Sequence, residues 1–274
     1  MIPHFRGELK LMEQIRVMTI NTWKCDGNYE KRLTLMAEQL KALSPGVVAC
    51  QECFSSNEAQ ADTLKFLAKA LNMNACFLPA RFRKRIFKDN WVQSFSGLGI
   101  LSAFQLEALE DYTLPEVPGD EPRKLQLAEI VLPGNDKMLI ANTHLTHLRN
   151  TELRKEQASF VAEKVSAFEA YKYKVVCGDF NAAPGSVELK ALVTKAKAID
   201  CYTAGAGAEP RYSLAEAYDR GIKICVDHIF VLPYPGTNTY PDFVNSAIVL
   251  NSKDNEKGIY PSDHFGISTA LVID

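Results

Sequence analysis

Apolar residues follow two kinds of pattern along the chain, and each kind predicts a different element. Residues 15–21 alternate between apolar and polar positions and are rich in β-branched side chains, which predicts a strand. Between Leu33 and Leu43, large apolar residues recur at spacings of three and four. This spacing predicts an amphipathic helix over residues 29–43, which the Ser44-Pro45-Gly46 segment ends.

The same patterns continue to the end of the chain. They predict further strands over residues 47–52, 98–102, 125–132, 138–145, 175–177, 222–232, 244–250 and 265–273. They predict further helices over residues 58–71, 152–171 and 185–195. Strands and helices alternate at first, and strands dominate later. This mixture predicts an α/β (α+β) fold in which two stacked sheets carry helices outside.

The length and the absence of a linker favour one domain. Of the 274 residues, 47% are hydrophobic and 23% are charged, as in ordinary globular proteins. No segment rich in Pro, Gly and Ser divides the chain. We therefore expect a flexible arm over residues 1–13 and a single domain over residues 14–274.

Charge and cysteine content limit the function classes. The net charge of −2 and the pI of about 6.2 argue mildly against a dedicated DNA enzyme, which would usually carry a basic face. Seven irregularly spaced cysteines, with Cys50 and Cys53 as a single C-x-x-C, favour reduced thiols and a cytoplasmic location over a zinc site. No stretch has the length of a signal peptide or a membrane span, so we expect no stable membrane insertion.

The segment Gly178-Asp179-Phe180-Asn181 is the most informative motif. It directly follows the apolar run 175–177, so it stands at the end of a buried strand. Asp179 and Asn181 are two residues apart and point to the same side of an extended chain. Gly178 has no side chain and leaves room for a close approach to the backbone.

Other polar residues stand at the ends of predicted strands. Asn21 and Glu52 each end a strand that precedes a helix, although either alone could be a capping or a surface residue. Because ligands collect outside the carboxyl ends of strands in α/β sheets, we expect them to share a site. Glu52 is a hard oxygen ligand suited to Mg²⁺. His144 ends another strand and could be functional or structural, and His147 stays undecided.

Two Asp-His pairs complete the set. Asp227 interrupts an apolar strand, where a carboxylate is costly unless it is paired or bound. It could be satisfied by backbone amides or could orient an imidazole. His228 points to the opposite face, which indicates a structural role. Asp263 and His264 stand where a loop enters the last strand, and a histidine there suits acid–base chemistry near neutral pH.

Residues 81–91 form the one strongly basic segment, with five cations and three aromatic residues. The segment could bind phosphates and stack bases, or it could be a solvated loop or hairpin whose aromatic residues face the core. Both interpretations stay open. The candidate substrate contacts are Arg81, Arg83, Arg85 and Trp91.

The order of these motifs resembles the endonuclease/exonuclease/phosphatase superfamily, which includes pancreatic-type deoxyribonuclease, neutral sphingomyelinases and inositol polyphosphate 5-phosphatases. The resemblance covers nearly the whole chain. The matching segments are residues 19–23, 51–52, 97–102, 142–145, 178–181, 226–229 and 262–264.

This resemblance implies a four-layer α-β-β-α sandwich with two mixed, mostly antiparallel β-sheets. It also implies a Mg²⁺ site, with Mn²⁺ as an alternative, in which Glu52 is the main ligand and Asn21 and Asp263 lie nearby. By the same resemblance, Asp179 orients or deprotonates the attacking water. The resemblance further implies that His144 and Asn181 hold the phosphate. It implies that Asp227 pairs with His264, which contacts the phosphate or shares the general-base role, so the base is not assigned to one residue.

Two positions depart from relatives. Ala103 stands where many relatives carry Arg, and His144 stands where abasic-site endonucleases use Tyr. The second departure favours the deoxyribonuclease, sphingomyelinase or phosphatase side of the superfamily. We expect the segments 77–95, 111–124 and 203–221 to be loops that determine the substrate.

The resulting hypothesis is Mg²⁺-dependent hydrolysis of a phosphate ester by a phosphodiesterase or phosphatase. A small molecule or a lipid headgroup is the expected substrate, and the alternative is an endonuclease or exonuclease acting on DNA or RNA. A non-catalytic binding module would carry a broken site, whereas each expected position holds a chemically competent residue.

Overall fold

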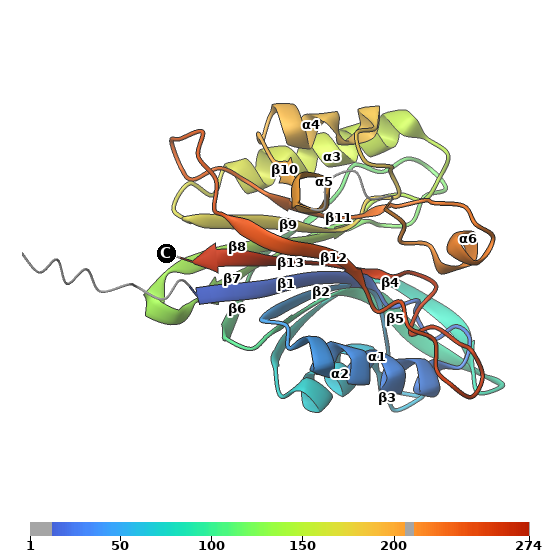
Figure 1. The fold of residues 1–274 in the computed structure, drawn as a ribbon. Coiled ribbons are helices and arrows are strands. Elements are labelled where there is room, and N and C mark those ends of the chain that lie inside the picture. The colour runs from blue at the N-terminus through green and yellow to red at the C-terminus, as the bar shows by residue number, and fades with distance from the viewer. Residues whose placement is uncertain (1–12, 206–210, 274) are drawn as a thin grey trace, which may run out of the picture.

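Buried apolar strands pair into two β-sheets that face each other, and helices cover both outer faces (Figure 1). The computed structural model describes residues 13–205 and 211–273. Each sheet contains one parallel pair, β1 with β2 and β8 with β9, while the other pairs are antiparallel. The expected sandwich of two mixed, mostly antiparallel sheets is confirmed.

The first sheet has the order β12-β13-β1-β2-β5-β4, and β3 pairs with β2. Its strands are β1 (Glu13–Asn21), β2 (Val47–Ser56), β3 (Ala61–Asp62), β4 (Asn74–Phe87), β5 (Asn90–Ser102), β12 (Phe243–Val249) and β13 (Gly266–Ile273). The second sheet has the order β10-β11-β9-β8-β7-β6. Its strands are β6 (Gln105–Thr113), β7 (Lys124–Val131), β8 (Lys137–His144), β9 (Tyr173–Asp179), β10 (Ile199–Asp200) and β11 (Asp227–Val231).

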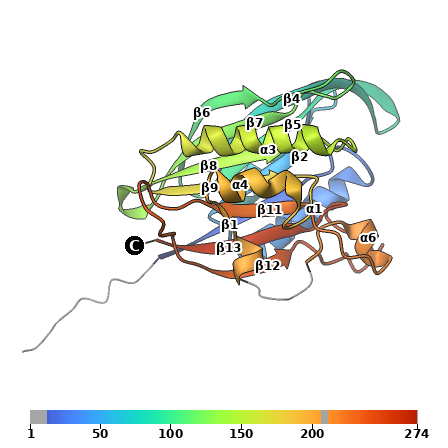
Figure 2. The ribbon, with the colours of Figure 1, turned by 90° about the horizontal axis from the view of Figure 1, so that it is seen from above.

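Helices lie on the two outer faces of the sandwich (Figures 1 and 2). The helices α1 and α2 cover the first sheet, and α3 and α4 cover the second. The bounds are α1 (Tyr29–Leu43), α2 (Thr63–Leu71), α3 (Thr151–Ser166), α4 (Lys190–Thr194), α5 (Cys201–Gly205) and α6 (Ala215–Asp219), with 3₁₀ turns at Pro133–Asn135 and Val187–Leu189. No helix among residues 13–205 and 211–273 has the length and apolar character of a membrane span.

Three apolar layers hold the four structural layers together. Between the sheets, residues such as Ala49 and Ile100 of one sheet pack against Ile140 and Val175 of the other. Met36 on α1 belongs to a second layer between the helices and the first sheet. A third layer joins α3 to the outer face of the second sheet. Burial of apolar surface at each interface is the main stabilising term of such a sandwich.

The segment expected to be a loop over residues 77–95 is instead a long hairpin formed by β4 and β5. Its side chains alternate with a period of two, but the β4 side chains before Phe87 are exposed or half-buried on both faces, so no apolar face marked the strand. The loop expected over residues 111–124 begins inside β6 for the same reason, because β6 has no buried position. Both loop predictions were wrong in these parts.

Several predicted bounds also change. The helix expected from residue 58 begins at Thr63, because Asp62 caps its first turn by accepting a hydrogen bond from Lys65 N. The helix expected over 152–171 ends at Ser166, and the strand expected from residue 222 begins at Asp227. Glu13, placed in the arm, is the first residue of β1, while the rest of the arm and residues 206–210 lie outside the described residues.

A buried amide pair connects the two sheets directly behind the strand ends. Gln51 Nε2 on β2 donates to Asn142 Oδ1 on β8 at 2.8 Å. Asn142 Nδ2 in turn donates to the backbone oxygens of Cys50 at 2.9 Å and Gly99 at 3.0 Å. Both amide side chains are fully buried. The bridge therefore fixes the position of one sheet relative to the other beside Glu52 and His144.

Candidate active site

The carboxyl ends of the two parallel strand pairs supply the polar residues of one pocket. Asn21 ends β1 and lies in register with Gln51, and His144 ends β8 and lies in register with Asp179. The pocket has a volume of about 460 Å³. Among the residues expected to be catalytic or metal-binding, those that line it are Asn21, Glu52, His144, Asp179, Asn181, Asp263 and His264. Asp227, the remaining member, lies fully buried behind His264.

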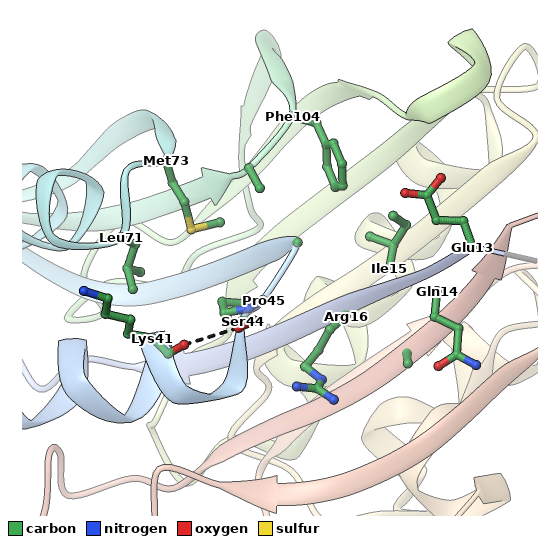
Figure 3. Close-up of a pocket in the computed structure, with 13 residues that line it drawn as sticks. Glu13, Gln14, Ile15, Arg16, Lys41, Ser44, Pro45, Leu71, Met73 and Phe104 are labelled. Carbon is green, nitrogen blue, oxygen red and sulfur yellow. Dashed lines mark hydrogen bonds between the residues drawn. The ribbon is translucent and has the colours of Figure 1, made fainter.

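A second cavity, of about 630 Å³, lies at the opposite end of β1 (Figure 3). Its lining offers one carboxylate, from Glu13, and two cationic groups, from Arg16 and Lys41. The Arg16 guanidinium already donates to the backbone oxygen of Leu43. This lining lacks a constellation suited to acid–base or metal chemistry, so we place the active site at the strand ends.

Local backbone geometry places two of the key residues. Gly178 packs so closely against β8 that a Cβ atom would lie 2.1 Å from the backbone oxygen of Thr143. The group that closely approaches the backbone of this glycine is therefore the neighbouring strand β8. Glu52 has a left-handed φ of 55° and lies where the register of β2 and β5 shifts between Cys50 and Cys53. Bulges of this kind redirect a side chain, here into the pocket.

Asp179 is held by hydrogen bonds from both sides. Its Oδ1 accepts from the backbone N–H of Asn181 at 3.0 Å, and its Oδ2 accepts from Asn21 Nδ2 at 3.0 Å. Burial and the negative charge of Asp227 raise the pKa of Asp179 to about 7, against the opposing effect of His264. A carboxylate with a raised pKa is a better proton acceptor near neutral pH.

Asp227 and His264 form a tight pair. His264 Nδ1 lies 2.8 Å from Asp227 Oδ2, which confirms the contact expected between the two residues. Burial alone would lower the pKa of His264, but the carboxylates of Asp227 and Asp179 outweigh it and raise the pKa to about 10. The imidazole is therefore protonated at neutral pH and points its Nε2 toward Asp179, at 3.9 Å from Oδ2.

Glu52 and Asp263 offer the hard oxygen atoms of the pocket. Burial would raise the pKa of Glu52, but Lys24, whose Nζ lies 3.0 Å from Oε2, lowers it and keeps the carboxylate charged. The pKa of Asp263 is raised by burial and, in addition, by the charge of Glu52. Two carboxylates that repel each other in a buried pocket, with the Asn21 amide beside them, fit a hard divalent cation.

The ligand atoms of Asp179, Asp227 and His264 also lie within 4.8 Å of one another. By distance alone they too could hold a metal ion. A protonated imidazole has no lone pair for a metal, however, and it already balances the charge of the carboxylates. With this charge balance the three residues are suited to proton transfer, and the oxygen atoms around Glu52 are suited to a metal ion.

His144 is kept neutral. Burial and the positive charges of Arg123 and Arg81 hold the pKa of His144 well below its usual value. Its Nε2 lies 3.4 Å from Asp179 Oδ2. A neutral imidazole can still donate one N–H, so His144 remains suited to contact a phosphate oxygen.

Two cationic residues of the pocket were missed at the sequence level. Arg123 is only 2% exposed, and its Nη2 lies 2.7 Å from His147 Nδ1. Within the described part of the chain, its Nε and Nη1 have no hydrogen-bond partner. Burial and the neighbouring Arg81 lower the pKa of Arg123 to about 10. The second missed residue is Lys24, whose ammonium group contacts Glu52. Its position three residues after Asn21, at the end of the first strand, was the only hint in the sequence.

Three arginines of β4 form one wall of the pocket, the arginine row of Arg81, Arg83 and Arg85. Arg81 lies 3.6 Å from Glu52, and both Arg81 and Arg83 contact Glu121. Trp91, expected to join them, pairs with Ile86 on the opposite face of the hairpin and is 68% exposed. The structure therefore brings the arginines to the site and leaves Trp91 outside it, because successive strand residues face opposite sides.

The aromatic residues of the basic segment divide between its two interpretations. Phe82 pairs with Phe95 across the strands and is 57% exposed, so it does not face the core. Phe87 is buried in an apolar cluster with Tyr29 and Phe54, as expected for a hairpin whose aromatic residues face the core. The arginine row faces the pocket, as expected for a segment that binds phosphates. Both interpretations therefore hold in part.

Fold and site together define a hydrolase of the type that cleaves phosphate esters. A model described as the endonuclease/exonuclease/phosphatase family matches residues 18–264. The chain belongs to this family. No curated protein sequence gives a significant match.

Solved structures share the fold at low sequence identity. An endonuclease/exonuclease/phosphatase from Beutenbergia cavernae is 20% identical with a TM-score of 0.75, and the match covers 95% of this chain and 72% of that one. The mannosyl-6-phosphatase Bt3783 of Bacteroides thetaiotaomicron is 20% identical with a TM-score of 0.68, over 94% and 100% of the two chains. A humanized TDP2 from D. rerio is 20% identical with a TM-score of 0.69, over 94% and 98%.

Proposed function

We propose that this chain is a Mg²⁺-dependent phosphodiesterase or phosphatase that acts on a small anionic phosphate ester. The observation that carries the proposal is the meeting of two different groups in one pocket. The carboxylates of Glu52 and Asp263 face the proton-transfer group of Asp179, Asp227 and His264. Neither group alone would perform the reaction, and their juxtaposition suits water attack on phosphorus.

Glu52, Asp263 and the amide oxygen of Asn21 would hold the cation. A bound Mg²⁺ supplies Lewis-acid polarisation of a phosphoryl oxygen. Asn21 has a second task, because its Nδ2 donates to Asp179 and its Oδ1 accepts from the backbone N–H of Trp23 at 3.0 Å. These contacts set the direction of the Asp179 carboxylate.

The protein residues carry out the proton transfer. Asp179, with its raised pKa, accepts the proton of the attacking water. The protonated His264, oriented by Asp227, stabilises the negative charge that develops on the phosphoryl oxygens. The neutral His144 and the Asn181 amide donate to the same oxygens, and each such donor accounts for about 10²-fold in rate or more.

The arginine row favours a substrate with additional negative charge. Side chains that alternate along a strand are spaced about 7 Å apart, so the three guanidinium groups lead outward from Glu52. A zwitterionic lipid headgroup would meet these cations with its own positive charge. Within the expected substrates, we therefore favour an anionic small molecule.

A nucleic acid strand is the second candidate, since the arginine row could contact successive phosphates. Plasmid DNA and single-stranded oligonucleotides separate the two candidates. If small phosphate esters are cleaved while both nucleic acids stay intact, the nuclease alternative is excluded.

The proposal is tested with bis-p-nitrophenyl phosphate and a panel of phosphate monoesters and diesters, with Mg²⁺, with Mn²⁺ and with EDTA. We expect turnover that EDTA abolishes and that Glu52→Gln lowers by about 10²- to 10³-fold. Glu163→Gln makes the same chemical change at an exposed carboxylate of α3 and should retain the wild-type rate. No metal-dependent turnover of any ester, or an unchanged rate in Glu52→Gln, would contradict the proposal.

A further inference from the structure

Arg32 of α1 is the largest fully buried side chain of the described structure. It is 1% exposed, and burial lowers the pKa of its guanidinium. Among the described residues it forms no ion pair within 4.0 Å, so its direct contacts are with neutral groups, while the carboxylates of Asp263 and Asp26 act on it from farther away. A buried arginine is costly unless all its donors are satisfied, which indicates that this one is retained for the contacts it makes.

All its side-chain hydrogen bonds go to backbone oxygens of two loops. Nε and Nη2 donate to the Asp26 oxygen at 2.9 and 2.6 Å. The other acceptors are the backbone oxygens of Thr22 and Pro261, at 3.1 and 3.0 Å from Nη1, and of Trp23 and Lys24, at 3.2 and 3.3 Å from Nη2. One guanidinium group thus joins the loop after β1 to the loop before β13.

These two loops carry ligands of the proposed metal site. Asn21 directly precedes the first loop, and Asp263 lies two residues after Pro261. A second tie supports the first, since Ser262 Oγ donates to the backbone oxygen of Asn21 at 2.6 Å. The distance between the two ligand-bearing segments therefore depends on contacts outside the pocket.

The first loop needs such support. Trp23 and Lys24 have left-handed φ angles of 56° and 42°, which cost roughly 1 kcal/mol each for residues other than glycine. The guanidinium also lies over the Trp23 ring, 4.7 Å from its centroid. Lys24 N donates to the Glu52 backbone oxygen at 3.1 Å, so the same loop conformation also contacts the third ligand-bearing segment.

We propose that Arg32 is a positioning residue that sets the spacing of the metal ligands on these loops. The inference rests on the metal site of the proposed function. Lysine cannot replace arginine here, because its single ammonium group cannot reach acceptors spread over two loops as the planar guanidinium does. Residues that orient metal ligands in this way typically contribute about ten- to hundredfold in metal affinity.

The test is calorimetric titration of Mn²⁺ into the full chain, with Arg32→Lys compared to the wild type. We expect a Kd about ten- to hundredfold weaker in Arg32→Lys while its circular dichroism spectrum stays native. Leu40→Ala is the matched control, because Leu40 is fully buried on the same helix and contacts apolar neighbours instead of the loops. It should be less stable and yet bind Mn²⁺ with the wild-type Kd.

Equal Kd values in Arg32→Lys and the wild type would overturn the inference, and so would an equal weakening in Leu40→Ala. If Arg32→Lys does not fold, Arg32→Gln keeps a planar group that can donate to fewer of these backbone oxygens, and a wild-type Kd in that variant would overturn the inference. Ester hydrolysis is measured on the same samples. A wild-type chain that binds Mn²⁺ without hydrolysing any ester refutes the proposed function alone, whereas one that does not bind Mn²⁺ refutes both.

Discussion

Asn142→Ala is expected to loosen the contact between the two sheets directly behind the active site. The change removes three short hydrogen bonds, two that Asn142 Nδ2 donates to the backbone oxygens of Cys50 and Gly99 and one that Oδ1 accepts from Gln51, and a longer one to Gln126 Oε1 at 3.4 Å. At about 1 kcal/mol for each of the three short hydrogen bonds, the loss is about 3 kcal/mol. A typical domain has only about 5–15 kcal/mol of stability, so the variant should be clearly weakened.

The assay is urea denaturation followed by circular dichroism, with Asn251→Ala as the control because Asn251 is exposed. A double-mutant cycle with Gln51→Ala then isolates the interaction between the two amides. Because each single variant already loses the hydrogen bond between Gln51 and Asn142, and the double variant loses it only once, we expect the combined loss to fall short of the sum by about 0.5 kcal/mol or more.

Additive losses in the cycle would refute the direct coupling of the two sheets through this amide pair. A change below about 0.5 kcal/mol in Asn142→Ala alone would refute the larger claim that the bridge stabilises the sandwich, because it would match an ordinary surface substitution.

Two further predictions concern the hairpin and a buried ion pair. In steady-state kinetics, Arg83→Ala should raise KM for anionic esters by about tenfold, because Arg83 belongs to the pocket wall. Trp91→Ala should leave the kinetics of a small soluble ester unchanged, since Trp91 lies on the outer face of the hairpin. An equal rise in KM in the two variants would contradict this prediction. Asp200, bound by His228 at 2.7 Å and Arg211 at 2.6 Å, has a pKa well below its usual range because these contacts outweigh burial. Its stabilisation is therefore fully present above its ordinary pKa of about 4 and is lost progressively as the pH falls from there toward the lowered pKa. Asp200→Asn should cost about 3 kcal/mol at pH 7 and steadily less as the pH falls below about 4 in urea denaturation, and a pH-independent difference would contradict this reasoning.

The candidate catalytic residues could be selected from the sequence because most of them are marked locally. Glu52 and Asp179 follow apolar runs, and a carboxylate at the end of a buried strand is rare without a purpose. The parallel pairing that brings such strand ends together follows from the helix between two strands. The pairing of Asp227 with His264, which are far apart in the chain, came from the family resemblance and is confirmed by the structure.

The walls of the pocket could not be predicted in the same way. The β4–β5 hairpin lacks a buried face over much of its length, so hydrophobic periodicity did not mark it, and Trp91 could not be separated from the arginines without the strand register. Arg123 carries no local signal at all, since its burial arises only when the segment before β7 packs against the pocket. A local sequence pattern cannot identify residues whose role depends on long-range packing.

The site is divided between the two sheets, and this division explains which remote residues matter. Glu52 and Asn21 extend from strands of the first sheet, whereas His144 and Asp179 extend from strands of the second. A shift of one sheet against the other would separate the proposed metal ligands from the proposed proton acceptor without breaking either group. The amide bridge opposes that shift between the sheets, and the Arg32 contacts oppose a similar shift between the loops of the first sheet. Both ties lie outside the pocket, so substitutions there should weaken metal binding or rate while every residue that touches the substrate stays intact.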